Sequence, residues 1–196
     1  MILGVIPARL NSTRFPSKVI FPLKGKPIIE HVYEKALQSN LLNKVIVAVD
    51  SEETKNVINC QNIIMTSDKH QSGTDRVAEV ANNFNCDIVV NIQGDEPGID
   101  PLLIDKLIQL FEDPDVEMAS IASTDLKEDD LNNDNVVKVN LDKENNAISF
   151  IRNNLNPEST YYRHIGIYAY RKNTLNLFTS LTQSDNEKNH RLEQLR

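Results

Sequence analysis

Positively charged and hydroxyl side chains gather directly after the first apolar run of the chain. Residues 2–6 are mostly branched and apolar, which is typical of a short buried strand, and Pro7 ends the run. The segment that follows carries Arg9, Ser12, Thr13, Arg14 and Lys18. Arginine presents planar pairs of N–H donors and lysine a compact charge, so this set suits a polyphosphate. Ligands of open α/β sheets lie beyond the carboxyl ends of the strands, which is where we expect this segment.

The same segment lacks the two common phosphate-loop signatures, G-x-x-x-x-G-K-[ST] and G-x-G-x-x-G. A solvated basic loop is the alternative interpretation of its charge. The order Pro-Ala-Arg-x-x-Ser-Thr-Arg-x-Pro-x-Lys is more specific, and it resembles the nucleotide-binding opening of the 3-deoxy-manno-octulosonate cytidylyltransferase (CMP-Kdo synthetase) family. The resemblance implies catalytic roles for Arg9 and Lys18 in holding a triphosphate. It also implies nucleotide contacts for Pro7, Ala8, Arg9, Ser12, Arg14 and Lys18.

A carboxylate follows a later apolar run. Residues 87–92 predict a buried strand, and Gly94 after it lets the backbone approach a ligand closely. Triphosphate chemistry requires a hard divalent cation, and Mg²⁺ prefers one or two carboxylates together with phosphate oxygens and water. Asp95 is the predicted Mg²⁺ ligand, and a turn residue before Pro97 is the alternative. The string from Val90 to Pro97 resembles the core motif of the same family, which implies that Asp95 is catalytic, Gly94 borders the nucleotide and Gln93 faces the sugar acid.

A polar loop with a glycine leads into a predicted helix near residue 73. Ser72 or Thr74 can cap this helix, and its free N–H groups favour an anion. Arg76 lies in the first turn, where a cation opposes the helix dipole, which indicates a role beyond stability such as holding an anion. A capped surface turn is the alternative. The string from His70 to Arg76 resembles the family's stretch near cytosine and ribose, which implies nucleotide contacts for Gln71, Ser72, Gly73 and Arg76.

Three further segments resemble the family's sugar-acid site. Residues 163–171 alternate sharply and place His164 and Tyr168 on one face, which suits a sugar or ordinary aromatic packing. An arginine follows a predicted hairpin, and the string from Arg191 to Arg196 closes the chain. The resemblance implies sugar-acid contacts for Arg152, His164, Tyr168, Glu193 and Gln194, together with Gln93.

The elements that must position these residues alternate between strand and helix. We expect strands at 2–6, 44–49, 63–65 and 87–92, with helices at 28–38, 52–58, after 73 and from 100 to 111. This order predicts right-handed parallel crossovers. Asp50, at a strand end, is interpreted as the cap of the next helix, with a contact to a nucleotide base as the alternative. The predicted fold is α/β, a Rossmann-like nucleotidyltransferase domain with a mainly parallel sheet and antiparallel additions. Those additions are expected at 118–122, 136–141, 147–151 and 163–171, and a last helix at 187–196.

Composition bounds the class of protein. A chain of 196 residues with 40% hydrophobic and 25% charged residues suits one soluble domain, spanning 1–196. The net charge of −7 argues against a nucleic-acid binder, and no apolar run suits a membrane span or a signal peptide. The two cysteines match no metal-binding spacing, which favours a reducing compartment.

The resemblance covers the chain from Val5 to Arg196. It implies a cytoplasmic homodimer that joins CTP to 3-deoxy-D-manno-octulosonate (Kdo), giving CMP-Kdo and pyrophosphate for lipopolysaccharide biosynthesis, with Mg²⁺ as cofactor. The family continues into a segment whose aspartate is the second Mg²⁺ ligand, and the single domain is expected to lack that segment. The alternatives are a cytidylyltransferase for 8-amino-Kdo or, with less support, sialic acid, and a catalytically incomplete nucleotide-binding module.

Overall fold

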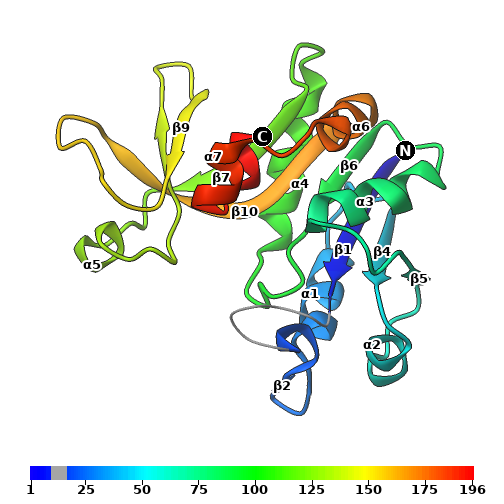
Figure 1. Ribbon diagram of the computed structural model, residues 1–196. Coiled ribbons are helices and arrows are strands. Elements are labelled where there is room, and N and C mark those ends of the chain that lie inside the picture. Colours follow the sequence, from blue (N-terminus) through cyan, green and yellow to red (C-terminus); the bar gives the residue numbers. More distant parts are fainter. Residues whose placement is uncertain (10–16) are drawn as a thin grey trace. The chain divides into compact units, whose positions relative to one another are not determined.

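The computed structural model describes residues 1–9 and 17–196, and these divide into two units (Figure 1). The first unit comprises residues 1–119 and 167–179, and the second comprises 120–166 and 180–196. Strands β7 (Met118–Ser123) and β10 (Tyr161–Arg171) each run from one unit into the other. Among the described residues, no helix is long and apolar enough to cross a membrane.

The first unit is built on a sheet in the order β5-β4-β1-β6-β10. Strands β5 (Ile63–Met65), β4 (Lys44–Val49), β1 (Ile2–Ala8) and β6 (Ile88–Asn91) are parallel, and β10 pairs with β6 in the antiparallel sense. Val5 of β1 lies opposite Ile46 on one side and Asn91 on the other. The carboxyl ends of these parallel strands therefore meet at one edge, as the alternation of elements predicts.

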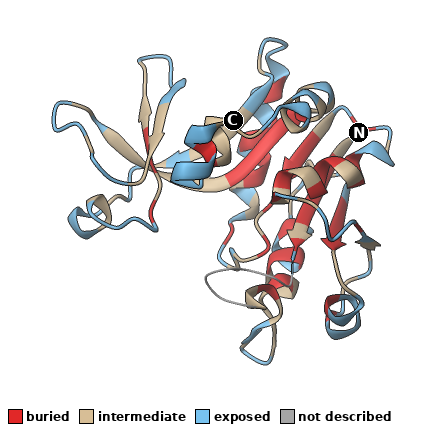
Figure 2. Ribbon diagram, in the orientation of Figure 1, coloured by how far each residue is buried: buried red, intermediate tan, exposed pale blue. Residues whose placement is uncertain are grey.

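Helices cover both faces of this sheet. Helix α3 (Gly73–Asn82) packs Val77, Val80 and Ala81 into a core with Leu3 and Val5, and Leu175 of α6 (Lys172–Ser180) joins the same core. Ile6 points to the opposite face and lies near Ile29 of α1 (Ile28–Ala36). Burial is accordingly deepest along β1, β4 and β6 (Figure 2). The unit also contains η1 (Lys18–Ile20), β2 (Pro22–Leu23), β3 (Lys26–Pro27), α2 (Glu52–Val57), α4 (Pro101–Gln109) and η2 (Leu110–Glu112).

The second unit is antiparallel. Strand β8 (Lys138–Leu141) pairs with β9 (Ala147–Ile151) and with the first residues of β10. Three short helical segments accompany them: α5 (Glu128–Leu131), α7 (Asp185–His190) and η3 (Glu193–Leu195). The predicted α/β class, with a mainly parallel sheet and antiparallel additions, is confirmed.

Several predicted boundaries differ from the structure. Strand β1 continues through Pro7 to Ala8, because β6 ends at Asn91 opposite Val5 and the sheet needs no N–H from Pro7 on that side. The helix expected at 187–196 divides at Arg191, whose φ of 53° is left-handed, into α7 and η3. Neither helix α6 nor the single turn α5 was predicted.

Candidate functional site

Three backbone segments of the first unit converge where β1 ends. A Cβ atom at Gly73, the first residue of α3, would lie 3.5 Å from the Pro7 Cγ atom. A Cβ atom at Gly94, in the turn after β6, would lie 2.9 Å from the Pro7 carbonyl oxygen, closer than a real side chain tolerates. Gly94 is therefore required by the close approach of this turn to β1. Three sequence-predicted nucleotide residues, Pro7, Gly73 and Gly94, lie together at the carboxyl edge of the sheet.

An ion pair lies at the same edge. The Lys18 Nζ atom donates to Asp95 Oδ2 at 2.7 Å, although 77 residues separate the two in the sequence. Both side chains are partly exposed, at 42% for Lys18 and 35% for Asp95, so both remain accessible to a ligand. Lys18 opens η1 directly after Ser17, which has a left-handed φ of 59°. The predicted phosphate-binding lysine and the predicted metal-binding carboxylate are thus neighbours.

The start of α3 is fixed by a capping box. Ser72 accepts a hydrogen bond from the Asp75 N–H at 3.1 Å, and the Asp75 carboxylate accepts one from the Ser72 N–H at 3.0 Å. Ser72 is buried, whereas Gln71 before it is exposed. Ala8 is buried at the end of β1 and Arg9 is exposed beside it. The predicted nucleotide residues Ser12 and Arg14 lie outside the described residues.

Arg76 is occupied by protein partners. Its side chain is 2% exposed, and it donates to Asp50 Oδ2 at 3.2 Å, to the Ser67 carbonyl at 3.1 Å and to the Thr66 hydroxyl. Burial lowers the Arg76 pKa, and the charge of Asp50 opposes that shift. Arg76 thus pairs with a carboxylate of the same chain, and its predicted contact with a nucleotide stays a prediction. The predicted cap role of Asp50 is wrong, because Ser51 caps α2 and accepts from the Thr54 N–H at 3.1 Å.

Two further predicted residues of the first unit lie along β6 and β10. Gln93 follows β6 and is half-buried, and Tyr168 of β10 lies opposite Asn91 in the pairing of these strands. Tyr168 is 8% exposed and packs 6.2 Å from the Tyr170 ring. The interpretation of its face as ordinary aromatic packing fits these contacts, and its predicted contact with a sugar acid stays a prediction.

His164 of the second unit is held by neighbours on two sides. Its Nε2 atom lies 2.8 Å from the Ser120 hydroxyl, and its ring meets the Phe150 ring edge-on at 5.0 Å between centroids. Burial lowers the pKa of His164 from its ordinary value of 6.5 to about 4. The imidazole is therefore neutral near pH 7, and it suits hydrogen bonding to hydroxyl groups better than pairing with a carboxylate.

Arg152 ties its own segment to two other backbone segments of the second unit, one at Asp134 and one at residues 190–191. Its guanidinium donates to the carbonyls of Asp134 at 2.8 Å, His190 at 3.2 Å and Arg191 at 3.3 Å. The carbonyl of Arg152 in turn accepts from the buried Lys138 Nζ atom at 2.6 Å. The predicted sugar-acid residues Glu193 and Gln194 form η3, which follows the turn that Arg152 holds. Their predicted contacts with a ligand stay predictions.

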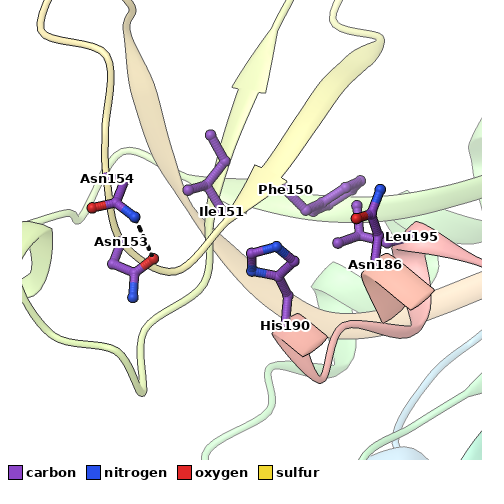
Figure 3. Close-up of a pocket in the computed structure, with 7 residues that line it drawn as sticks. All are labelled: Phe150, Ile151, Asn153, Asn154, Asn186, His190 and Leu195. Carbon is purple, nitrogen blue, oxygen red and sulfur yellow. Dashed lines mark hydrogen bonds between the residues drawn. The ribbon is translucent and has the colours of Figure 1, made fainter. Parts of the chain in front are cut away.

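A pocket of about 260 Å³ lies within the second unit. Figure 3 shows the His190 ring between two asparagines, Asn153 and Asn154, and the Phe150 ring. Ile151, Asn186 and Leu195 complete the lining. The pocket therefore combines amide and imidazole groups with an apolar wall, and it borders the segments that contain Arg152 and η3.

Comparison with known proteins decides the family. The family model described as cytidylyltransferase matches residues 3–196. The 3-deoxy-manno-octulosonate cytidylyltransferase of Pelobacter propionicus is 39% identical over 214 residues, covering 100% of this chain and 84% of that protein. The chain belongs to the 3-deoxy-manno-octulosonate cytidylyltransferase family. The enzyme of that name from Koribacter versatilis is 41% identical, and the match covers 99% of this chain and 77% of that protein.

Solved structures of this family and of others agree with the fold. A CMP:2-keto-3-deoxy-manno-octonic acid synthetase complexed with CTP has a TM-score of 0.90 and 36% identity, covering 99% of this chain and 83% of that chain. A cytidylyltransferase from Leptospira borgpetersenii has a TM-score of 0.63 at 18% identity, with 98% of this chain and 71% of that chain covered. The second likeness shows the fold alone.

The partners of these residues are less evident in the sequence. Asp50, Glu79 and Ser120 each contact a predicted residue or its loop, as partners of Arg76, His70 and His164. Asp50 stood out by its place at a strand end, although its partner lies 26 residues away. Ser120 lies within an apolar run, where a lone hydroxyl was the one available signal.

Proposed function

We propose that this chain transfers the cytidylyl group of CTP to Kdo, giving CMP-Kdo and pyrophosphate. The structural observation that supports this reaction most directly is the Lys18–Asp95 ion pair, which lies at the carboxyl edge of the sheet beside the start of α3. Identities of 39–41% to proteins named 3-deoxy-manno-octulosonate cytidylyltransferase support the same reaction. So does the likeness to a synthetase complexed with CTP.

The reaction exchanges one bond to phosphorus for another. The oxygen of the anomeric C2 hydroxyl of Kdo attacks the α-phosphorus of CTP, and the bond from that phosphorus to the bridging oxygen of pyrophosphate breaks. The hydroxyl proton leaves to solvent, since we assign no residue as general base. Arg9 and Lys18 hold and neutralise the triphosphate, and Gly94 lets the backbone of the turn lie against it. Positioning and charge stabilisation supply the catalysis.

Mg²⁺ fits the donor set that Asp95 provides. Among the described residues, no group of three or more histidine, cysteine, aspartate or glutamate side chains forms a ready metal cage. A single partly exposed carboxylate suits Mg²⁺, which takes most of its ligands from phosphate oxygens and water. Asp95 would hold the ion, whose chemistry is to neutralise phosphate charge and to polarise the phosphoryl oxygens.

We infer the acceptor substrate, the oligomeric state and the cellular location from membership of the family. We assign Gln93, Arg152, His164, Tyr168, Glu193 and Gln194 to the sugar acid, and the neutral state of His164 supports a contact with a hydroxyl group. The protein would act in the cytoplasm as a homodimer that supplies lipopolysaccharide synthesis. Since 8-amino-Kdo differs from Kdo at one substituent, it is the comparison acceptor, and sialic acid is the distant one.

Pyrophosphate release with Mg²⁺, CTP and each acceptor tests the function. We expect release that depends on both CTP and Kdo. Asp95→Asn should lower turnover by about a hundredfold or more, because a lost metal ligand removes several kcal/mol of charge stabilisation. Asp87→Asn is the matched control, since Asp87 lies at the opposite end of β6 from Asp95 and pairs with the Met1 amino group.

Each outcome has a defined meaning. Near-normal turnover of a folded Asp95→Asn variant would overturn Asp95 as the essential Mg²⁺ ligand. Faster release with 8-amino-Kdo than with Kdo would reassign the substrate. Binding of CTP without release for any acceptor would favour the nucleotide-binding module.

A further inference from the structure

The loop that precedes α3 is held by charged side chains of that helix. Residues 66–72, here called the 66–72 loop, connect β5 to α3 and carry Gln71 and Ser72. Arg76 holds the beginning of this loop, through the Thr66 hydroxyl and the Ser67 carbonyl at 3.1 Å. Thr66 also donates through its hydroxyl to the Val49 carbonyl at 2.9 Å, which links the loop to the end of β4.

Glu79 holds the same loop from one turn further along α3. Its Oε2 atom accepts from the Ser67 N–H at 3.0 Å and from the His70 Nε2–H. These hydrogen bonds lower the Glu79 pKa against the effect of burial, so the side chain is a carboxylate near pH 7. Arg76 and Glu79 are three residues apart and therefore lie on neighbouring positions of one helix face. Together they fix Thr66, Ser67 and His70.

Asp50, the residue directly after β4, completes this arrangement. Its carboxylate is 12% exposed and pairs with Arg76 NH2 at 3.2 Å, which supplies the charge that a buried guanidinium requires. The charges of Glu79, Arg9 and Asp68 also act on Arg76. The 66–72 loop is thus anchored to one helix and one strand end by charge-assisted hydrogen bonds, which are stronger than neutral ones.

We propose that Asp50, His70, Arg76 and Glu79 are positioning residues that set the 66–72 loop for the nucleoside part of CTP. This inference rests on the proposed function and deepens it. Arg76 acts through the loop, because at least three of its donors are spent on Thr66, Ser67 and Asp50. The exposed Gln71 and the capping residue Ser72 follow the fixed segment directly, so their presentation to a ligand depends on the anchoring.

Glu79→Gln tests the anchoring with little change in size. We expect the Kd and KM for CTP to rise about tenfold, because part of the free energy of CTP binding must then order the loop. The kcat and the KM for Kdo should stay within about twofold, since neither phosphates nor acceptor are touched. Calorimetric titration of the full chain with CTP and Mg²⁺ and steady-state pyrophosphate release give these values. Glu34→Gln is the matched control, because Glu34 of α1 pairs with Lys26 at the surface.

A second readout is independent of the ligand. Amide hydrogen exchange within residues 66–72 should accelerate in Glu79→Gln and in the milder His70→Gln, while exchange in β1 and β6 stays unchanged. Faster loop exchange with an unchanged Kd for CTP would overturn the inference, and so would unchanged exchange. A wild-type chain that binds no CTP would overturn the proposed function itself, and the inference with it.

Discussion

His164 is a residue whose environment sets its charge. Its ring is packed against Phe150, and Ser120 holds its Nε2 atom. Burial disfavours the imidazolium, which is why the pKa falls from 6.5 to about 4. The side chain keeps one proton and one lone pair throughout the neutral range. It can therefore form a hydrogen bond with a hydroxyl group of a ligand, and it carries no positive charge that would attract a carboxylate.

The titration of His164 is the first prediction at this scale. Its imidazole resonances in an NMR titration should stay in the neutral form from pH 8 to pH 5 and shift only near pH 4. A His164 midpoint near 6.5 would show that the ring is solvated and would contradict its burial.

Arg76 and Asp50 show where residue-level prediction stops. Both charges are visible in the sequence, and the first-turn position of Arg76 was interpreted as a sign of a role such as holding an anion. The structure pairs it with Asp50 of the same chain. The identity of that anion depends on how β4 and α3 are placed, which no local pattern encodes. By contrast, Ser72 was predicted as a possible cap and is confirmed, because capping is a relation between residues three apart.

At the scale of elements, the period of apolar residues decided the outcome. Strand β4 was predicted with the bounds that the structure has, since a continuous apolar run ended by Asp50 leaves little freedom. Helix α6 was missed because its polar positions, such as Asn173 and Asn176, blur the helical period. The helix expected at 187–196 ends early at Arg191, where a non-glycine residue adopts a left-handed conformation that no propensity predicts.

The contact between the end of β1 and the turn after β6 carries a prediction about elements. Gly94→Ala should place a Cβ atom 2.9 Å from the Pro7 carbonyl oxygen and push the turn away from β1. We expect a loss of about 1–3 kcal/mol in the free energy of unfolding. The kcat should fall by a larger fraction than the free energy of unfolding does, because Asp95 directly follows the displaced Gly94.

Gly98→Ala is the control for this substitution. A Cβ atom there would meet no heavy atom within 4 Å, so the change should be neutral or slightly stabilising. Urea unfolding gives the free energies, and pyrophosphate release gives kcat. Equal stability and activity of the two variants would show that β1 and the turn do not depend on close approach.

At the scale of the whole molecule, buried carboxylates link stability to pH. Asp105 accepts from the Asn40 and Leu41 N–H groups at 3.1 and 3.2 Å, which fixes the connection after α1 in the first unit. In the second unit, Glu187 meets Arg196 through two hydrogen bonds of 2.7 and 3.0 Å, and both side chains are almost fully buried. The pKa of each carboxylate is lowered, in Glu187 chiefly by Arg196 and in Asp105 by hydrogen bonds that outweigh desolvation.

These lowered pKa values all make the folded state less stable as the pH falls. A carboxylate with a lowered pKa in the folded state binds fewer protons than the unfolded chain, so its stabilisation is complete above its ordinary pKa and disappears as the pH falls through the folded value. His164 acts in the same direction at higher pH, because between about 4 and 6.5 the unfolded histidine is protonated and the folded one is not. Stability should therefore fall in two successive windows on acidification.

Glu187→Gln separates the two windows. It leaves the Arg196 charge buried without its carboxylate, so the free energy of unfolding at pH 7 should fall by about 3–5 kcal/mol. Urea unfolding followed from pH 7 to pH 3 should show a shallower fall below about pH 4.5 than in the wild type, because the lost carboxylate no longer titrates. The slope between pH 6.5 and 5, which His164 governs, should persist in this variant.

Glu34→Gln, which removes an exposed pair, should change neither window by more than about 1 kcal/mol. A Glu187→Gln variant as stable as the wild type at every pH would mean that the Glu187–Arg196 pair contributes nothing to folding.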